Sequence, residues 1–229
     1  MMRHIRLAAA IVALVMTAQS SKADTCYVVV FGAVSKPQRA RYSHSWATFV
    51  RVPGCPAGAR PGNGAPMETF TISWYAQSEE LRPLRLFAEC GRNLDLPETF
   101  RIVLSHCELV SAWGPFEIDP ELYQMARCHK NRLESGEIRY KTIDWVRNPN
   151  RTSNCIHALT AFNTAERRVY VGRTNFGQVA SYDVVKNYDY WMINPCQTHP
   201  WIADLLCLNQ WPVRWRTLDE GRPRPRMEP

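Results

Sequence analysis

The sequence predicts an α+β domain in which an antiparallel sheet packs against helices, papain-like in circularly permuted order. Two observations indicate the sheet: residues 26–34 form a β-branched run fit for a buried strand, and residues 43–52 and 68–76 alternate between apolar and polar side chains. A third observation is the change to capped helical segments in the middle of the chain, most clearly at 119–136.

Residues 1–23 are typical of an export signal. They have a basic start, an apolar stretch at 7–16 that is too short to span a bilayer comfortably, and small residues in an A-x-A-like pattern at 21–23. An uncleaved anchor is the alternative. We expect an exported protein, periplasmic or extracellular, without a transmembrane segment once the signal is removed.

About 206 residues then remain, which is enough for one well-filled domain and too few for two generous ones. Removal of the signal lowers the formal net charge from +7 to +4, and the remaining basic residues are scattered. This modest charge gives little support to nucleic-acid binding, and weak attraction to anionic polymers is the most that it suggests. We expect the domain at 24–217 and a disordered, basic, proline-rich tail at 218–229.

Turn and cap signals predict the remaining elements. Before residue 137 the expected elements are a Pro- and Gly-rich loop at 53–66, a helix opening at 97–107, a strand from 108 to the Gly-Pro at 114–115, and a helix at 119–136. After it they are a strand at 137–146, a helix at 153–165, a strand at 167–172 and a helix at 176–188.

Eight cysteines lie in the mature chain, a number that in an exported protein favours disulfides. Cys196 and Cys207 stand close together in a Pro-containing stretch and are predicted to form a local disulfide. For Cys155, three interpretations stay open: a reactive thiolate, one half of a disulfide, or a small core residue. Since the Cys and His spacing matches no zinc site, we expect no metal and no cofactor.

Cys155 is the candidate nucleophile because it is predicted at the first turn of a helix, where unpaired N–H groups and the helix dipole favour a thiolate. His44, at the start of a predicted strand between Ser43 and Ser45, is the candidate base. His157 is nearer in sequence, but two residues along a helix turn it about 200° away from Cys155. We therefore expect His157 to pack behind the helix.

These motifs resemble a known family. A His at the head of a strand in "HSWATF", followed much later by "NC" and an apolar run that opens a helix, resembles the circularly permuted papain-like cysteine hydrolases. This is the NlpC-like group, whose relatives include YiiX-type bacterial proteins and lecithin retinol acyltransferase. Across roughly residues 26–190, the segments "HSWATFV", "TISW", "WGPFEIDPELY", "RLESGEIRYKTID" and "SNCIHA" look like a set of uncharacterised exported bacterial proteins of that type.

The resemblance implies that Cys155 is the nucleophile and His44 the base. The family usually places a third polar group on the strand after the His, to hold the tautomer and orientation of the imidazole. Here Phe70 stands where a polar residue would be expected, and the substitutes are Glu68, Thr71 and Ser73. Of these we select Glu68.

The expected activity is hydrolysis of an amide, peptide or ester bond through an acyl-enzyme on Cys155. The backbone N–H of Cys155 and the Asn154 side chain are expected to stabilise the oxyanion. Peptide, cell-wall or lipid-ester substrates fit this scheme, and no nucleic-acid partner is expected. One alternative is a non-enzymatic, disulfide-stabilised envelope binding module, which Phe70 favours; another is acyl transfer to a lipid or amine.

Overall fold

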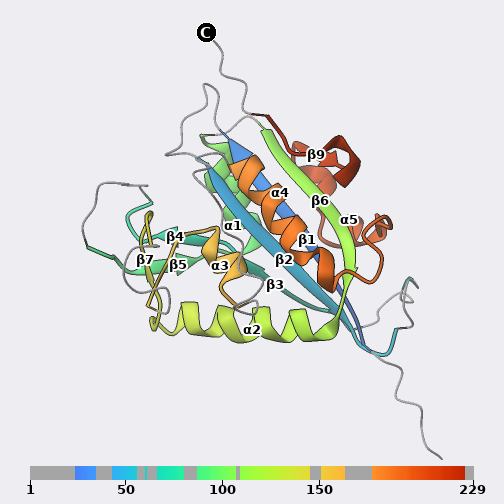
Figure 1. The fold of residues 1–229 in the computed structure, drawn as a ribbon, viewed down its shortest axis with the longest axis horizontal. Coiled ribbons are helices and arrows are strands. Elements are labelled where there is room, and N and C mark those ends of the chain that lie inside the picture. Colours follow the sequence, from blue (N-terminus) through green and yellow to red (C-terminus); the bar gives the residue numbers. More distant parts are fainter. Residues whose placement is uncertain are drawn as a thin grey trace, which may run out of the picture.

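The centre of the molecule is a mixed five-stranded sheet with helices on both faces (Figure 1). The computed structural model describes residues 24–34, 43–55, 60, 66–79, 87–106, 109–144, 151–162 and 177–224. The strand order is β3-β2-β1-β6-β9. Their bounds are β1 Thr25–Val34, β2 His44–Val52, β3 Glu68–Ile72, β6 Leu109–Ile118 and β9 Val213–Arg216.

The sheet is antiparallel except at one edge, where β9 pairs in parallel with β6. The prediction of a wholly antiparallel sheet is therefore wrong for this last pair. A parallel pair needs a long crossover connection. Here the chain between Ile118 and Val213 forms this connection. Because β9 is short and its partner strand is distant in sequence, its own residues do not predict the pairing.

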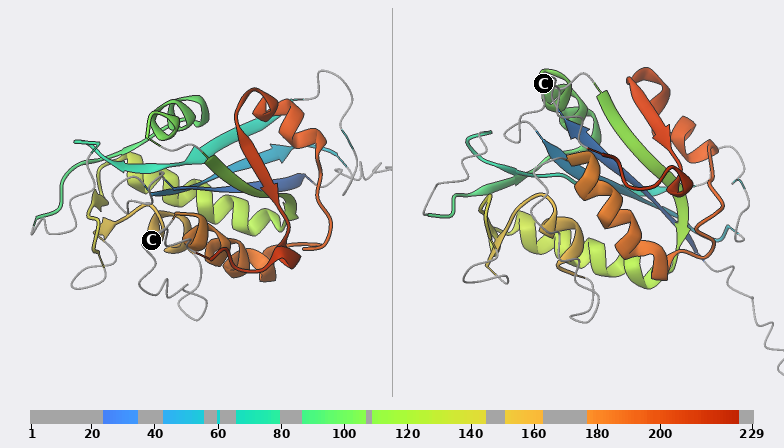
Figure 2. Two further views of the ribbon diagram at one scale, coloured as in Figure 1. Left: turned by 90° about the horizontal axis from the view of Figure 1, so that it is seen from above. Right: turned by 45° about the horizontal axis from the view of Figure 1, so that its top comes forward.

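Helices flank both faces of the sheet, as two further views show (Figure 2). Those on one face are α2 Pro120–Glu134, α3 His157–Thr160 and α4 Gly177–Tyr188, and those on the other are α1 Leu96–Leu104 and α5 Trp201–Leu205. The 3₁₀ turns in the described part of the chain are η3 Asp189–Trp191, η4 Leu208–Gln210 and η5 Leu218–Glu220. None of the helices in the described ranges is long and apolar enough to cross a membrane.

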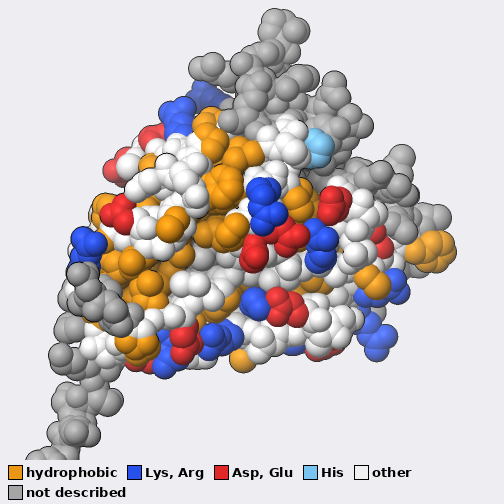
Figure 3. All heavy atoms as spheres, turned by 180° about the vertical axis from the view of Figure 1, so that it is seen from behind, with side chains coloured by type: hydrophobic (Ala, Val, Ile, Leu, Met, Phe, Trp, Pro, Cys, Tyr) orange, Lys and Arg blue, Asp and Glu red, His pale blue; other side chains and the backbone are white. Residues whose placement is uncertain are grey.

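Two hydrophobic cores lie on opposite faces of the sheet because the side chains of each strand alternate between them. In β1 the first core takes Cys26, Val28 and Val30, and the second takes Tyr27, Val29 and Phe31. The first core packs against α2, α3 and α4, and the second against α1 and α5. Seen from behind, hydrophobic side chains also gather on the outer surface of the molecule (Figure 3).

Two small sheets extend from one end of the main sheet. The first pairs β4 Trp74–Ala76 with β5 Gly91–Asn93, and the second pairs β7 Arg139–Tyr140 with β8 Thr152–Ser153. The strand predicted at 68–76 is thus two strands, separated at Ser73. Of the strand predicted at 137–146, residues 145–146 lie outside the described part of the chain, and the described residues form the two-residue strand β7, which pairs with β8.

Other predicted boundaries also change. The strand expected to end at the Gly-Pro of 114–115 continues to Ile118, and its pairing with β1 shifts register near Val28 and Val30, where a proline without an N–H is tolerated. The helices expected at 119–136 and 176–188 are confirmed as α2 and α4. Within its described residues, 153–162, the helix expected at 153–165 is reduced to α3, while the strand at 167–172 and most of the loop at 53–66 lie outside the described residues.

The packed chain extends beyond residue 217, so the domain boundary predicted there comes too early. Leu218 packs against the first core, and Thr217 and Glu220 form a capping box around η5. Arg222 makes an ion pair with Asp183 of α4. These contacts of Glu220 and Arg222 hold the segment against the domain, and they could not be predicted from its basic, proline-rich composition.

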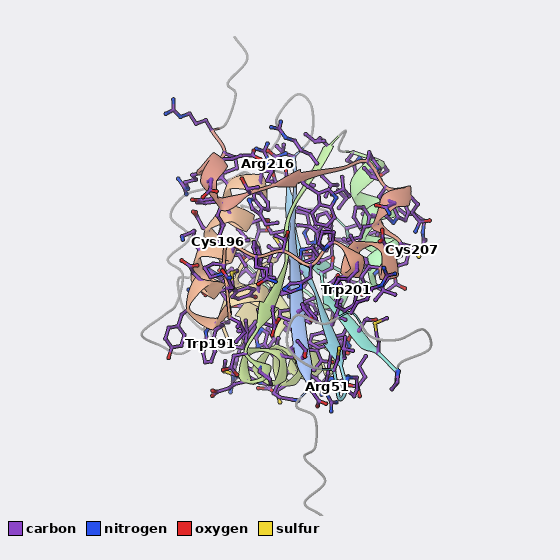
Figure 4. The ribbon with its side chains drawn as sticks, turned by 90° about the vertical axis from the view of Figure 1, so that its right-hand side faces the viewer. Arg51, Trp191, Cys196, Trp201, Cys207 and Arg216 are labelled. Atoms are coloured by element: carbon purple, nitrogen blue, oxygen red, sulfur yellow. The ribbon has the colours of Figure 1, made fainter. Side chains whose placement is uncertain are left out.

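The disulfide predicted between Cys196 and Cys207 is wrong. Both are exposed free thiols. Figure 4 shows them at opposite sides of the molecule. Between them the chain forms α5 rather than a tight turn, and this separates residues that are close in sequence.

Asp119 caps α2, and its side chain accepts a hydrogen bond of 2.8 Å from the backbone N–H of Glu121. We expect Asp119→Ala to lower the free energy of unfolding by about 1 kcal/mol, because a backbone N–H loses its partner. Asp119→Asn keeps an acceptor and should stay within a few tenths of a kcal/mol of wild type. Urea denaturation of the three proteins measures the difference, and equal losses in both variants would contradict the capping role.

Candidate functional site

His44 is the first residue of β2, and its ring is buried on the side of the second core. The ring stacks on Trp46, lies 4.0 Å from the ring of Tyr75 between centroids, and its Nε2 shares a 2.9 Å hydrogen bond with Ser73 Oγ. The residue is only 2% exposed. Burial lowers the pKa of His44 to about 3, so the imidazole is neutral at physiological pH.

Ser73 occupies the break between β3 and β4, where the chain leaves the main sheet. Its backbone N–H donates to Asn93 Oδ1 at 2.8 Å, and its carbonyl accepts from the N–H of Leu94 at 3.0 Å. The Asn93 side chain also donates to the carbonyl of Thr71 at 2.9 Å. These contacts hold the Ser73 hydroxyl against His44.

Glu68, selected from the sequence as the third catalytic residue, lies far from His44. It pairs with Arg51 across the β2–β3 register and makes ion pairs with Arg51 and Arg127. Arg51 is seven residues beyond His44 along β2, or about 23 Å at the rise of an extended strand. The prediction of Glu68 is therefore wrong, and the neighbour of the imidazole is Ser73, one of the two other substitutes.

Cys155 lies in the turn that leads into α3 and is a free thiol, 8% exposed. The backbone N–H groups of Ser45, Cys155 and Ile156 act on its sulfur and favour the thiolate form. The Ser45 nitrogen is bonded to the carbonyl carbon of His44, so the sulfur lies one peptide group from His44 Cα. The structure thus places Cys155 next to the backbone at the start of β2. β3 pairs with β2 only from Ala47 onward, which leaves the β3 side of β2 open at this point.

Burial dominates the protonation state of Cys155. It raises the pKa of Cys155 to about 11, and the charge of Asp144 acts in the same direction, whereas the three N–H groups lower it. At rest, therefore, both the Cys155 thiol and the His44 imidazole are neutral. This differs from the preformed thiolate that the helix-start position predicted, because desolvation outweighs the donated hydrogen bonds.

Asn154, predicted as an oxyanion donor, has both ends of its side chain engaged elsewhere. Its Oδ1 accepts from the backbone N–H groups of Ile156 at 2.9 Å and His157 at 2.8 Å, so it caps the turn. Its Nδ2 donates to Thr142 O at 3.3 Å and to Asp144 Oδ1 at 3.2 Å. The donors directed at the sulfur are backbone amides instead.

Sequence reasoning missed two polar neighbours of Cys155, namely Asp144 and Tyr140. The Asp144 carboxylate accepts from the backbone N–H of Asn154 at 2.8 Å and contacts His157 Nδ1 at 2.6 Å. Burial raises the pKa of Tyr140 well above its ordinary value, and nearby Cys155 adds to the effect. Both residues fall in a segment interpreted as a strand, so its acidic side chain ten residues before Asn154 was overlooked.

The N-terminus of α4 packs directly on the backbone of the strand that carries His44. The Gly177 carbonyl accepts a hydrogen bond from Ser45 Oγ at 3.1 Å. Ser181 Oγ lies 2.9 Å from Ser45 Oγ and donates to Phe31 O at 2.6 Å. This buried contact fixes the position of the first residues of β2.

Among the described residues, no three His, Cys, Asp or Glu side chains are grouped so that they could hold a metal ion. No family model matches the sequence, and neither a curated protein nor a solved structure resembles it significantly.

Proposed function

We propose that the protein is a cysteine hydrolase that cleaves an amide, peptide or ester bond through an acyl-enzyme on Cys155. The observation that carries the proposal is the set of backbone N–H groups around the Cys155 sulfur, one of them from the residue next to His44. The chain order, with a strand-borne His before a Cys that leads into a helix, supports a permuted papain-like arrangement.

The neutral thiol and imidazole suggest how the reaction begins. As the sulfur attacks the acyl carbon, His44 takes the thiol proton, and the resulting imidazolium then protonates the leaving group. The N–H groups of Ser45 and Cys155 are suited to donate to the oxyanion, because the sulfur and the oxyanion of the intermediate share one carbon. Water, activated by His44, then releases the acyl group, while Ser73 keeps the imidazole oriented.

Peptides, cell-wall peptides and lipid esters are the substrate classes that we propose, in the exported location indicated by residues 1–23. All three present a carbonyl carbon to the sulfur. If a lipid or amine replaces water as the acceptor, the same acyl-enzyme gives an acyltransferase.

A binding module without turnover is the second candidate. The observation in its favour is that burial holds both Cys155 and His44 in their neutral forms. In that case the buried thiol would be a core residue, and the hydrogen bond between His44 and Ser73 would serve stability alone.

Acylation by p-nitrophenyl acetate distinguishes the two candidates. For a hydrolase we expect release of p-nitrophenolate and an acetyl group on Cys155, located by peptide mass spectrometry. His44→Ala should slow acylation by about 10²- to 10⁴-fold, the usual contribution of a general base. Ser73→Ala should cause a smaller loss. The matched control is Thr71→Ala, since the Thr71 hydroxyl bonds Thr48 rather than His44.

Two results would contradict the hydrolase. One is an acetyl group found on other residues and absent from Cys155; the other is acylation of Cys155 at the same rate in His44→Ala as in wild type. Either would leave the binding module as the better account. Thermal unfolding of each variant shows whether a loss of rate reflects unfolding.

A further inference from the structure

The turn that carries Cys155 is held by a buried carboxylate. Asp144 contacts the backbone N–H of Asn154, the Asn154 side-chain amide and the Nδ1 of His157. The Asp144 side chain is 2% exposed, whereas that of His157 is 30% exposed. One carboxylate therefore joins the residues on both sides of Cys155.

Capping alone does not account for this arrangement. The N–H groups of Ile156 and His157 already have the Asn154 side chain as their acceptor. The aspartates that cap the other helices, Asp95 and Asp119, are exposed or half-buried. Burying a carboxylate costs free energy unless it is well paired. A helix cap alone does not explain why the Asp144 carboxylate is buried.

We propose that Asp144, with His157 as its partner, is a positioning residue for Cys155: it fixes the turn so that the sulfur faces the Ser45 amide. The inference rests on the proposed function for its catalytic meaning, although its geometry does not depend on turnover.

The charge of Asp144 provides a signature of its nearness to the Cys155 sulfur. Tyr140 is a titratable neighbour of the sulfur, and Asp144 is a carboxylate whose charge acts on it. Its negative charge opposes a thiolate and so contributes to the raised pKa of Cys155. Asn at this position keeps the shape and removes the charge.

The test is the rate of iodoacetamide labelling of Cys155 against pH, located by mass spectrometry on the full chain. We expect Asp144→Asn to move the midpoint of the profile down by about one pH unit, roughly a tenfold faster rate below the midpoint. Asp119→Asn is the matched control, because it makes the same change at a helix cap on α2, and its profile should superimpose on wild type. If Asp144→Asn does not fold, His157→Ala removes the partner instead and should lower the labelling rate severalfold, because the Asp144 charge that opposes the thiolate is then left without its His157 contact.

A wild-type profile in Asp144→Asn, or an equal shift in Asp119→Asn, would overturn the proposal and make Asp144 an ordinary cap. So would an unchanged labelling rate in His157→Ala, if that variant has to be used. Labelling does not require turnover. A shifted profile without acylation by p-nitrophenyl acetate would therefore keep the positioning role and reject the hydrolase. Acylation without a shifted profile would keep the hydrolase and reject the positioning role.

Discussion

Gly177→Ala is expected to lower the free energy of unfolding by about 3 kcal/mol, at the upper end of what overpacking a core costs. A Cβ at this position would fall inside the contact distance of the carbonyl oxygens of Ala33 and His44, and 2.9 Å from His44 N. These atoms are backbone in two paired strands, so neither can move aside alone. Helix propensity by itself predicts the opposite sign, since alanine stabilises a helix relative to glycine by about 1 kcal/mol.

Urea denaturation monitored by circular dichroism measures this loss. Gly136→Ala is the matched control: nothing lies within 4 Å of its added Cβ, but its φ of +80° costs alanine about 1 kcal/mol. A Gly177→Ala protein as stable as wild type would show that α4 does not rest on the backbone of β2. Since the same contact positions His44, we also expect the variant to acylate Cys155 more slowly.

The local signals in the sequence were sufficient for the long elements. The β-branched run in β1, the alternation in β2 and the caps of α2 are properties of neighbouring residues, so these elements could be predicted. β7, β8 and β9 are short, and their pairing depends on segments distant in the chain or on a connection with no pattern of its own. No window of sequence contains that information.

In the candidate site too, features set by neighbouring residues could be predicted and those set by distant residues could not. Cys155 and His44 could be selected as candidates because Cys155 lies at a predicted helix start and His44 at a predicted strand start. The third residue depends on the register between β2 and β3, which pairs Phe70 with Phe49 and leaves Ser73 beside His44. Phe70 stacks on Phe49 with 5.1 Å between ring centroids, so it belongs to the core and does not replace a catalytic group.

Acidification is expected to destabilise the protein from about pH 6.5 downward. Burial lowers the pKa of His44 to about 3 and that of His129 to about 4, both below the 6.5 of an exposed imidazole. Below pH 6.5 these two histidines therefore bind protons in the unfolded chain but not in the folded protein, so the free energy of unfolding falls as the pH falls. The loss ends near pH 4 for His129 and near pH 3 for His44. Because each unit of pKa difference is worth about 1.4 kcal/mol, the two together remove several kcal/mol.

Urea denaturation at pH values from 7.5 to 4 tests this expectation, and His129→Leu isolates one contribution. The Nε2 of His129 is buried without a hydrogen-bond partner, so leucine removes a titrating group without breaking a bond at that nitrogen. We expect the variant to lose about 3 kcal/mol less than wild type across that range, given the pKa of about 4 for His129. Met125→Leu on the same helix changes packing without adding or removing charge, and should shift the curve while keeping its slope. A wild-type slope in His129→Leu would mean that this histidine is protonated in the folded protein, and that the core around α2 admits water.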